Sequence, residues 1–372
     1  MHSGEIMQSN DSEPPMAELD SEDEFDFIQR LTVGAICVLL GVMGWYGYQL
    51  WTGEVTLVGP HPELVSEQNQ FENLIQLNEI DGLTGAGVKV CIVDSGIDVT
   101  HPDLNGINLV EWVDLVNGQL SPYDDQSHGT MMAGILAADG GLKGVAPNVE
   151  LYIAKALAEN GSGESSIVAD AIDWCINKGV NIISLSLGGS QGATSIILGS
   201  DVENSVEDAY SAGIVVVAAA GNDGENDDGD VASPGNIDSV ICVGAVDSRG
   251  SIWSGSSVGD NNGNLWPITL PRNDPDKKPE IVAPGQKVPV ILPDGKWGYA
   301  DGTSAATVYV TGAIALLLEN QPELMDGGED MIDDLKDWLM DSAKMKADQT
   351  DHDDYYGYGL LKISDFIAES EA

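Results

Sequence analysis

The stretch VKVCIVDSG, residues 88–96, decides the fold of this chain. An almost unbroken run of apolar residues, several of them β-branched, leads to Asp94, and Ser95 and Gly96 follow at once. This pattern is typical of a buried strand that ends in a turn. A strand that is apolar on both faces must be covered on both faces, so the stretch predicts a central strand of a parallel sheet.

Strand-like and helical segments alternate along the rest of the chain. Helical patterns occupy residues 128–138, 167–179 and 207–213, and strand-like runs occupy residues 149–157, 180–189 and 214–222. This alternation predicts an α/β fold with a mostly parallel β-sheet and helices on both faces, over a domain spanning residues 71–372. In such sheets the functional groups gather at the carboxyl ends of the strands.

The length of the chain limits the number of its domains, and its charge limits the kinds of partner that it can bind. A chain of 372 residues can bury the core of one large domain or of two small ones. It carries 61 Asp and Glu against 15 Lys and Arg, a formal net charge of -46. Such a charge repels phosphates, so nucleic acid is not an expected partner. The acidic surplus indicates adaptation to salt, with plain solubility as the alternative interpretation.

The N-terminal part has three segments. Residues 1–30 hold nine acidic residues and one Arg, which predicts an acidic disordered tail. Residues 31–51 are uncharged and have the length of about 20 residues that a single transmembrane helix needs, with a buried core helix as the alternative. A secretory signal would have a basic start and a shorter apolar core. Residues 52–70 are interpreted as a linker.

The expected orientation of this helix follows from one nearby positive charge, Arg30. Arg30 lies on its N-terminal side, and the next positive residue is Lys89. The positive-inside rule therefore places the tail in the cytoplasm. We expect a single-pass protein of the cell membrane with an extracytoplasmic domain.

The chain has four cysteines, Cys37, Cys91, Cys175 and Cys242, without any C-x-x-C spacing. This spacing gives no support for a zinc site. Free buried thiols are the expected state.

Four polar residues stand at predicted element ends. Asp94 and Asn222 end strands, whereas His128 and Ser304 begin helical patterns, Ser304 in DGTSAATVYV, residues 301–310. A serine, a histidine and an aspartate can act as nucleophile, base and orienting carboxylate, and an asparagine amide can donate to an oxyanion. Taken singly, each has a simpler interpretation as a turn, loop or helix-cap residue.

Together these residues and their surroundings resemble the subtilisin-type serine proteases, the subtilases. The similar blocks span roughly residues 71–365 and include IVDSGIDVTHPDL, HGTMMAGILAA, NIISLSLGG, GIVVVAAAGND and DGTSAAT. The resemblance implies Asp94, His128 and Ser304 as the catalytic triad and Asn222 as the oxyanion donor. Met131, Met132, Ala305, Val308 and Tyr309 depart from the family's motifs, but none of them carries the chemistry.

The resemblance also implies a polypeptide substrate bound as an extended strand. It places these residues around the pocket for the side chain before the cleaved bond: Ser186, Leu187, Gly188, Ala218, Ala219, Gly221 and Ala232. The acidic loop NDGENDDGD, residues 222–230, lies beside the pocket. It could favour basic substrate residues, hold calcium, or be a solvated turn of an acidic protein.

No cofactor is implied for the chemistry, and calcium is implied only as a structural ion. One family calcium site uses an aspartate equivalent to Asp103 and the loop after the HGT helix, which is short here (ADGGLKG, residues 138–144). The sequence thus predicts a membrane-anchored serine endopeptidase that hydrolyses peptide bonds through an acyl-enzyme. The alternative is a membrane-anchored binding or scaffold protein with a subtilase shell and no enzymatic activity.

Overall fold

The structure is a computed structural model that describes residues 21–52, 59–187, 200–224, 230–259, 264–265, 268–269 and 272–372. The chain divides into two compact units, Met1–Val58 and Gly59–Ala372. Each unit is described by itself. Residues 1–20 of the predicted tail, the end of strand-like residues 180–189 and most of the acidic loop lie outside the described residues.

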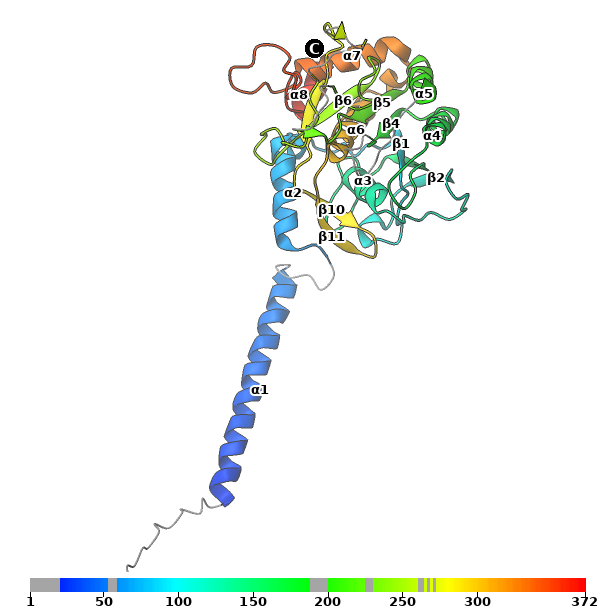
Figure 1. Ribbon diagram of the computed structural model, residues 1–372. Helices are drawn as coiled ribbons and strands as arrows, with labels where there is room; N and C mark the ends of the chain where they lie inside the picture. Colours follow the sequence, from blue (N-terminus) through cyan, green and yellow to red (C-terminus); the bar gives the residue numbers. More distant parts are fainter. Residues whose placement is uncertain are drawn as a thin grey trace, which may run out of the picture. The chain divides into compact units, whose positions relative to one another are not determined.

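A seven-stranded sheet forms the centre of the second unit (Figure 1). Its strand order is β2-β3-β1-β4-β5-β6-β9, and every neighbouring pair is parallel. The strands are β1 (Lys89–Asp94), β2 (Leu109–Asp114), β3 (Glu150–Lys155), β4 (Ile182–Leu185), β5 (Val215–Ala219), β6 (Ile241–Val246) and β9 (Ile281–Pro284). The predicted α/β fold with a mostly parallel sheet is confirmed.

Helices cover both faces of this sheet. The helices of this unit are α2 (Pro62–Leu74), α3 (His128–Ala137), α4 (Ser165–Lys178), α5 (Ser200–Ser211), α6 (Thr303–Asn320), α7 (Gly328–Asp341) and α8 (Ile363–Glu369). Of these, α3, α4, α5 and α6 pack directly against strands of the sheet. Because side chains alternate along a strand, Val90 and Ile92 of β1 pack in the core with α3 and α6, whereas Cys91 and Val93 pack in the core with α4. Every residue of α6 from Thr303 to Leu318 is buried, since this helix crosses the middle of the sheet.

Two antiparallel pairs complete the second unit. Strands β10 (Val288–Leu292) and β11 (Lys296–Ala300) form a hairpin against α3, and β7 (Asn264–Leu265) pairs with β8 (Ile268–Thr269). Short 3₁₀ turns occupy Leu77–Glu79, Pro102–Leu104 and Pro322–Asp326.

The predicted linker, residues 52–70, differs from the structure in its second half. Helix α2 begins at Pro62, and its Leu64 and Phe71 are buried in the main core together with Ile75. These apolar residues are seven and four positions apart, so they share one helix face, but the polar residues between them hide the pattern. The folded unit therefore begins near Gly59 rather than at residue 71.

The first unit contains helix α1 (Ser21–Thr52), which begins ten residues before the predicted apolar segment. Its Phe25–Tyr48 stretch is long and apolar enough to cross a membrane, and none of it is buried within the described structure. The stretch fits either a single transmembrane helix or a signal helix.

The prediction of four free thiols is wrong for two cysteines. Cys91 on β1 and Cys175 on α4 form a disulfide, whereas Cys37 and Cys242 are free. The two bonded residues are 84 positions apart, so no local spacing could reveal the pair. The packing of α4 on β1 brings them together.

Candidate active site

The four candidate residues lie at the carboxyl edge of the parallel sheet and at the helix starts that follow it. Asp94 is the last residue of β1, and Asn222 comes three residues after β5. His128 is the first residue of α3, and Ser304 is the second residue of α6. Helices α3 and α6 pack against each other, so their starts lie on neighbouring elements.

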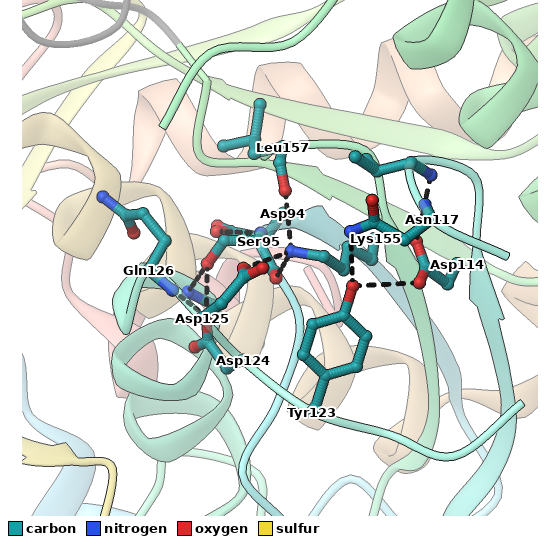
Figure 2. Close-up of polar contacts among 12 residues, drawn as sticks. Asp94, Ser95, Asp114, Asn117, Tyr123, Asp124, Asp125, Gln126, Lys155 and Leu157 are labelled. Atoms are coloured by element: carbon teal, nitrogen blue, oxygen red, sulfur yellow. Dashed lines mark hydrogen bonds and ion pairs between the residues drawn. The ribbon is translucent and has the colours of Figure 1, made fainter. Parts of the chain in front are cut away.

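Asp94 and His128 form a direct pair. His128 Nδ1 lies 2.9 Å from Asp94 Oδ1 and 2.8 Å from Oδ2. Asp94 is fully buried, and the backbone N–H of Ser95 donates to its Oδ1 at 2.6 Å (Figure 2). This carboxylate fixes the orientation of the imidazole and the tautomer with the proton on Nδ1, which leaves Nε2 as an acceptor.

The pKa of His128 reflects this pair. Burial of the ring lowers the pKa, but the charge of Asp94 and its hydrogen bond raise it, and the charge of Asp124 adds to the rise. The net pKa lies above the usual value for imidazole. The 23% exposure of the side chain keeps the ring accessible from solvent.

Ser304 is held by the backbone at the end of β4. Its Oγ donates to the carbonyl oxygen of Ser186 at 3.1 Å, and Ser186 Oγ donates to the carbonyl oxygen of Ser304 at 3.0 Å. Between the described side chains of Ser304 and His128 there is no hydrogen bond in this state. In ligand-free sites such bonds are often long and form only with substrate.

Asn222 is oriented by the start of α6. Its Oδ1 accepts from the backbone N–H of Thr303 at 2.9 Å and lies 3.0 Å from Thr303 Oγ1. Since the oxygen is engaged with Thr303, the amide Nδ2 is the end that can donate to a ligand. Asn222 Nδ2 and the backbone nitrogen of Ser304 lie close to one point beside Gly302. A Cβ atom added to Gly302 would lie 3.7 Å from Asn222 Nδ2 and 3.8 Å from Ser304 N.

Most of the predicted pocket residues lie on adjacent strand ends. Ser186 and Leu187 follow β4, Ala218 and Ala219 end β5, and all four are buried. Gly221 has φ of +106°, and a Cβ there would meet Ala232 Cβ at 3.0 Å, so Ala232 lies against this wall. Gly188 lies outside the described residues.

Sequence reasoning missed Thr303 and Ser95. The hydroxyl of Thr303, the residue before Ser304, contacts Gly221 and Asn222, and the N–H of Ser95 donates to Asp94. Their only signal in the sequence is that each adjoins a candidate residue.

Calcium does not fit at Asp103. The buried carboxylate accepts from the backbone N–H of Gly141 at 2.8 Å, from that of Leu142 at 2.9 Å and from Trp297 Nε1 at 2.7 Å. Calcium needs six to eight oxygen ligands, whereas these three N–H groups point their hydrogens at the carboxylate. The short loop 138–144 therefore closes onto Asp103 directly.

This arrangement predicts that stability does not depend on calcium at Asp103. We expect any change in Tm caused by EDTA to be the same, within about 1 °C, in the wild-type protein and in Asp103→Ala, because Asp103 holds no calcium in the native state. Asp103→Ala should lower Tm by roughly 5 °C, because three N–H groups, that of the buried Leu142 among them, lose their acceptor. Thermal unfolding with EDTA and with added calcium measures both. A rise in Tm with calcium that Asp103→Ala abolishes would contradict the prediction.

Comparison with known proteins identifies the same region as similar to proteases. The model of the Subtilase family matches residues 85–359. Subtilisin from Bacillus pumilus is 36% identical over 287 residues, which cover 76% of this chain and 91% of that protein. Subtilisin NAT from Bacillus subtilis subsp. natto is also 36% identical over 287 residues, covering 76% of this chain and 66% of the relative, just under two thirds of its length. The alkaline protease of Alkalihalobacillus alcalophilus is 37% identical over 244 residues, 65% of this chain and 56% of that protein.

Proposed function

Because the chain belongs to the subtilase family, we propose that it is a serine endopeptidase that acts through Ser304, His128 and Asp94, with Asn222 as oxyanion donor. The observation that carries the proposal is the contact of both Asp94 oxygens with His128 Nδ1, at 2.8 and 2.9 Å. A buried carboxylate held against the imidazole at the start of α3 is what a general base requires.

The first half of the reaction forms the acyl-enzyme. Ser304 Oγ leaves the Ser186 carbonyl and attacks the carbonyl carbon of the substrate, while His128 Nε2 takes the hydroxyl proton. The carbonyl electron pair moves to oxygen, which accepts hydrogen bonds from Asn222 Nδ2 and the backbone N–H of Ser304. The intermediate then expels the amine, which receives the proton from His128.

The second half repeats these steps with water. His128 Nε2 takes a proton from water, the hydroxide attacks the acyl carbon, and the carboxylic acid leaves as Ser304 regains its proton. Asp94 stabilises the imidazolium in both halves, because its carboxylate stays ionised beside Nδ1.

Hydrolysis of unfolded casein and of fluorogenic Lys and Leu peptides by the full-length protein, at low and high salt, tests the proposal. A serine-directed phosphonate should abolish it. If the protein hydrolyses none of these substrates at either salt concentration, or if the phosphonate does not inhibit it, the scaffold alternative is favoured. A loss of Lys preference with rising salt would point to substrate attraction by the acidic loop, residues 222–230.

The role of His128 predicts the pH dependence. The base must be neutral, so kcat/KM should fall as pH drops through its pKa and imidazolium forms. Because the pKa is raised, the midpoint of this acid limb should lie above 6.5. Peptide hydrolysis measured from about pH 4 to about pH 9 checks this. A midpoint at or below the usual imidazole value would contradict the assignment of the base.

We also propose that α1 anchors the protein in the membrane with the peptidase domain outside the cytoplasm. The support is the length and apolar character of Phe25–Tyr48, the position of Arg30 before most of that stretch, and the Cys91–Cys175 disulfide. Disulfides persist in oxidising compartments and are rare in the cytosol.

This topology predicts an asymmetric result in intact cells. External protease should remove an epitope at the C-terminus and spare one at the N-terminus, because only the C-terminal side of α1 faces out. Because Cys91 and Cys175 are fully buried, alkylation is tested after denaturation, where both should resist the reagent until a reductant opens the disulfide. A protected C-terminal epitope would contradict the orientation, and release of the whole protein from washed membranes would contradict the anchor.

A further inference from the structure

The loop before His128 carries a second carboxylate, Asp124, which the triad does not include (Figure 2). Its Oδ1 accepts from the backbone N–H groups of Gln126 at 3.1 Å and Ser127 at 2.9 Å. Its Oδ2 accepts from the backbone N–H of Thr130 at 2.8 Å and from Thr130 Oγ1 at 2.6 Å. Asp124 therefore ties the loop to the first turn of α3, the turn that begins with His128.

The backbone of this turn needs such a brace. Ser127, the residue before His128, has φ of +83°, a left-handed conformation that is uncommon for a residue with a side chain. Its side chain makes no capping hydrogen bond. The conformation is held by Asp124 through the Ser127 N–H and by Gln126 Oε1, which accepts from the His128 N–H at 2.8 Å.

Ser95 connects this brace to the triad carboxylate. Its Oγ donates to Asp124 Oδ1 at 2.9 Å and accepts from the backbone N–H of Gly129 at 2.9 Å. Its own N–H donates to Asp94 Oδ1. The end of β1 is thus joined to the start of α3 by the Asp94–His128 and Ser95–Gly129 contacts, and to the loop before α3 by the Ser95–Asp124 contact.

The other charged side chains near the loop, Lys155, Asp125 and Asp114, form hydrogen bonds with groups other than His128. Lys155 on β3 is fully buried and donates to Asp125 Oδ1 at 2.6 Å and to the carbonyl oxygens of Ser95 and Leu157. Asp114 accepts from Tyr123 and from backbone N–H groups after β2 (Figure 2). Among the described residues, Asp94 and Asp124 are the carboxylates whose charges raise the pKa of His128.

We propose that Asp124 is a positioning residue for His128: it fixes the loop and the first helical turn that present the imidazole, and it adds a second negative charge that favours the imidazolium. The inference rests on the proposed function in that it takes His128 as the general base. Two linked effects follow: a geometric one, carried by the contacts of Asp124 with Ser127 and Thr130, and an electrostatic one, carried by its charge.

The electrostatic effect can be measured without activity. In the full-length protein in detergent, with ¹³C-labelled histidine and His128 assigned through His128→Ala, the imidazole is titrated by NMR. Asp124→Asn should lower the pKa of His128 by about half a unit or more, because a charge that favours imidazolium is lost. Asp114→Asn is the matched control. It removes a buried carboxylate that also organises a loop, and it should leave the His128 titration unchanged.

The geometric effect appears in kinetics. Asp124→Asn should lower kcat about tenfold with little change in KM, and the acid limb of kcat/KM should move to lower pH. Thr130→Val keeps the charge of Asp124 and removes the hydroxyl contact to it, together with the hydrogen bond that Thr130 Oγ1 accepts from the Asp98 N–H, so it should lower kcat severalfold without moving the acid limb. This variant also serves if Asp124→Asn does not fold.

The outcomes separate this inference from the proposed function. Equal His128 titrations in wild type and Asp124→Asn, or an equal shift in Asp114→Asn, would overturn the electrostatic role. Wild-type kcat in Thr130→Val would overturn the geometric one. A wild-type protein that lacks hydrolysis contradicts the proposed function instead, while the NMR comparison still decides whether Asp124 acts on His128.

Discussion

Replacement of Ser304 by alanine is expected to lower kcat by about six orders of magnitude, the size known for the corresponding change in subtilisin. The acyl-enzyme cannot form without Oγ, whereas the oxyanion donors and the binding pocket remain. The fold should persist, because the hydroxyl makes one backbone hydrogen bond, to Ser186 O. Peptide hydrolysis and thermal unfolding of the purified full-length variant measure both expectations.

A matched control for this change is Ser184→Ala. Ser184 is a buried serine within β4, and its Oγ accepts a hydrogen bond at 3.2 Å from Thr311 Oγ1 of α6, the helix that carries Ser304. Unlike Ser304, it does not lie at the start of that helix. Its loss should leave kcat within about twofold of wild type. Comparable activity in Ser304→Ala and wild type would show that the hydrolysis comes from another residue or a contaminant.

The second large effect is expected at the oxyanion site. Asn222→Ala should lower kcat by about 10²–10³, the range known for the subtilisin oxyanion asparagine, with little change in KM. The amide donates to charge that develops only in the transition state, so substrate binding hardly depends on it. Steady-state kinetics with one peptide separates the two parameters.

Asn181→Ala provides the comparison for this asparagine. Asn181 lies just before β4, and its Oδ1 accepts from Lys89 N at the opposite end of the sheet. We expect a small loss of stability and an unchanged kcat. A rise in KM without a fall in kcat for Asn222→Ala would assign Asn222 to substrate binding instead of oxyanion stabilisation.

The sequence predicts the parts of this fold that repeat a simple pattern. The buried parallel strands are continuous apolar runs, and the polar residues that follow them, such as Asp94 and Asn222, stand out for that reason. Their convergence follows from the rule that strands of a parallel sheet end at one edge. The Asp94–His128 contact is a direct consequence of that topology.

The features that the sequence did not predict depend on contacts between distant segments. Helix α2 has only a few apolar residues, and its place is defined by the core it covers. The Cys91–Cys175 bond joins residues on different elements. Asp103 is a calcium ligand by resemblance, yet its N–H partners come from the loop 138–144 and from Trp297, 194 positions away. Such long-range pairs leave no local pattern.

Ser304 is proposed to be a nucleophile that His128 activates. The most direct measurement is to react the full-length protein with a fluorophosphonate and locate the adduct by mass spectrometry after digestion. We expect one adduct per chain, on Ser304, with strongly reduced labelling in His128→Ala because the hydroxyl then lacks its base. Absence of an adduct on Ser304 in the wild-type protein, or labelling of Ser304 at the same rate in His128→Ala, would contradict this proposal.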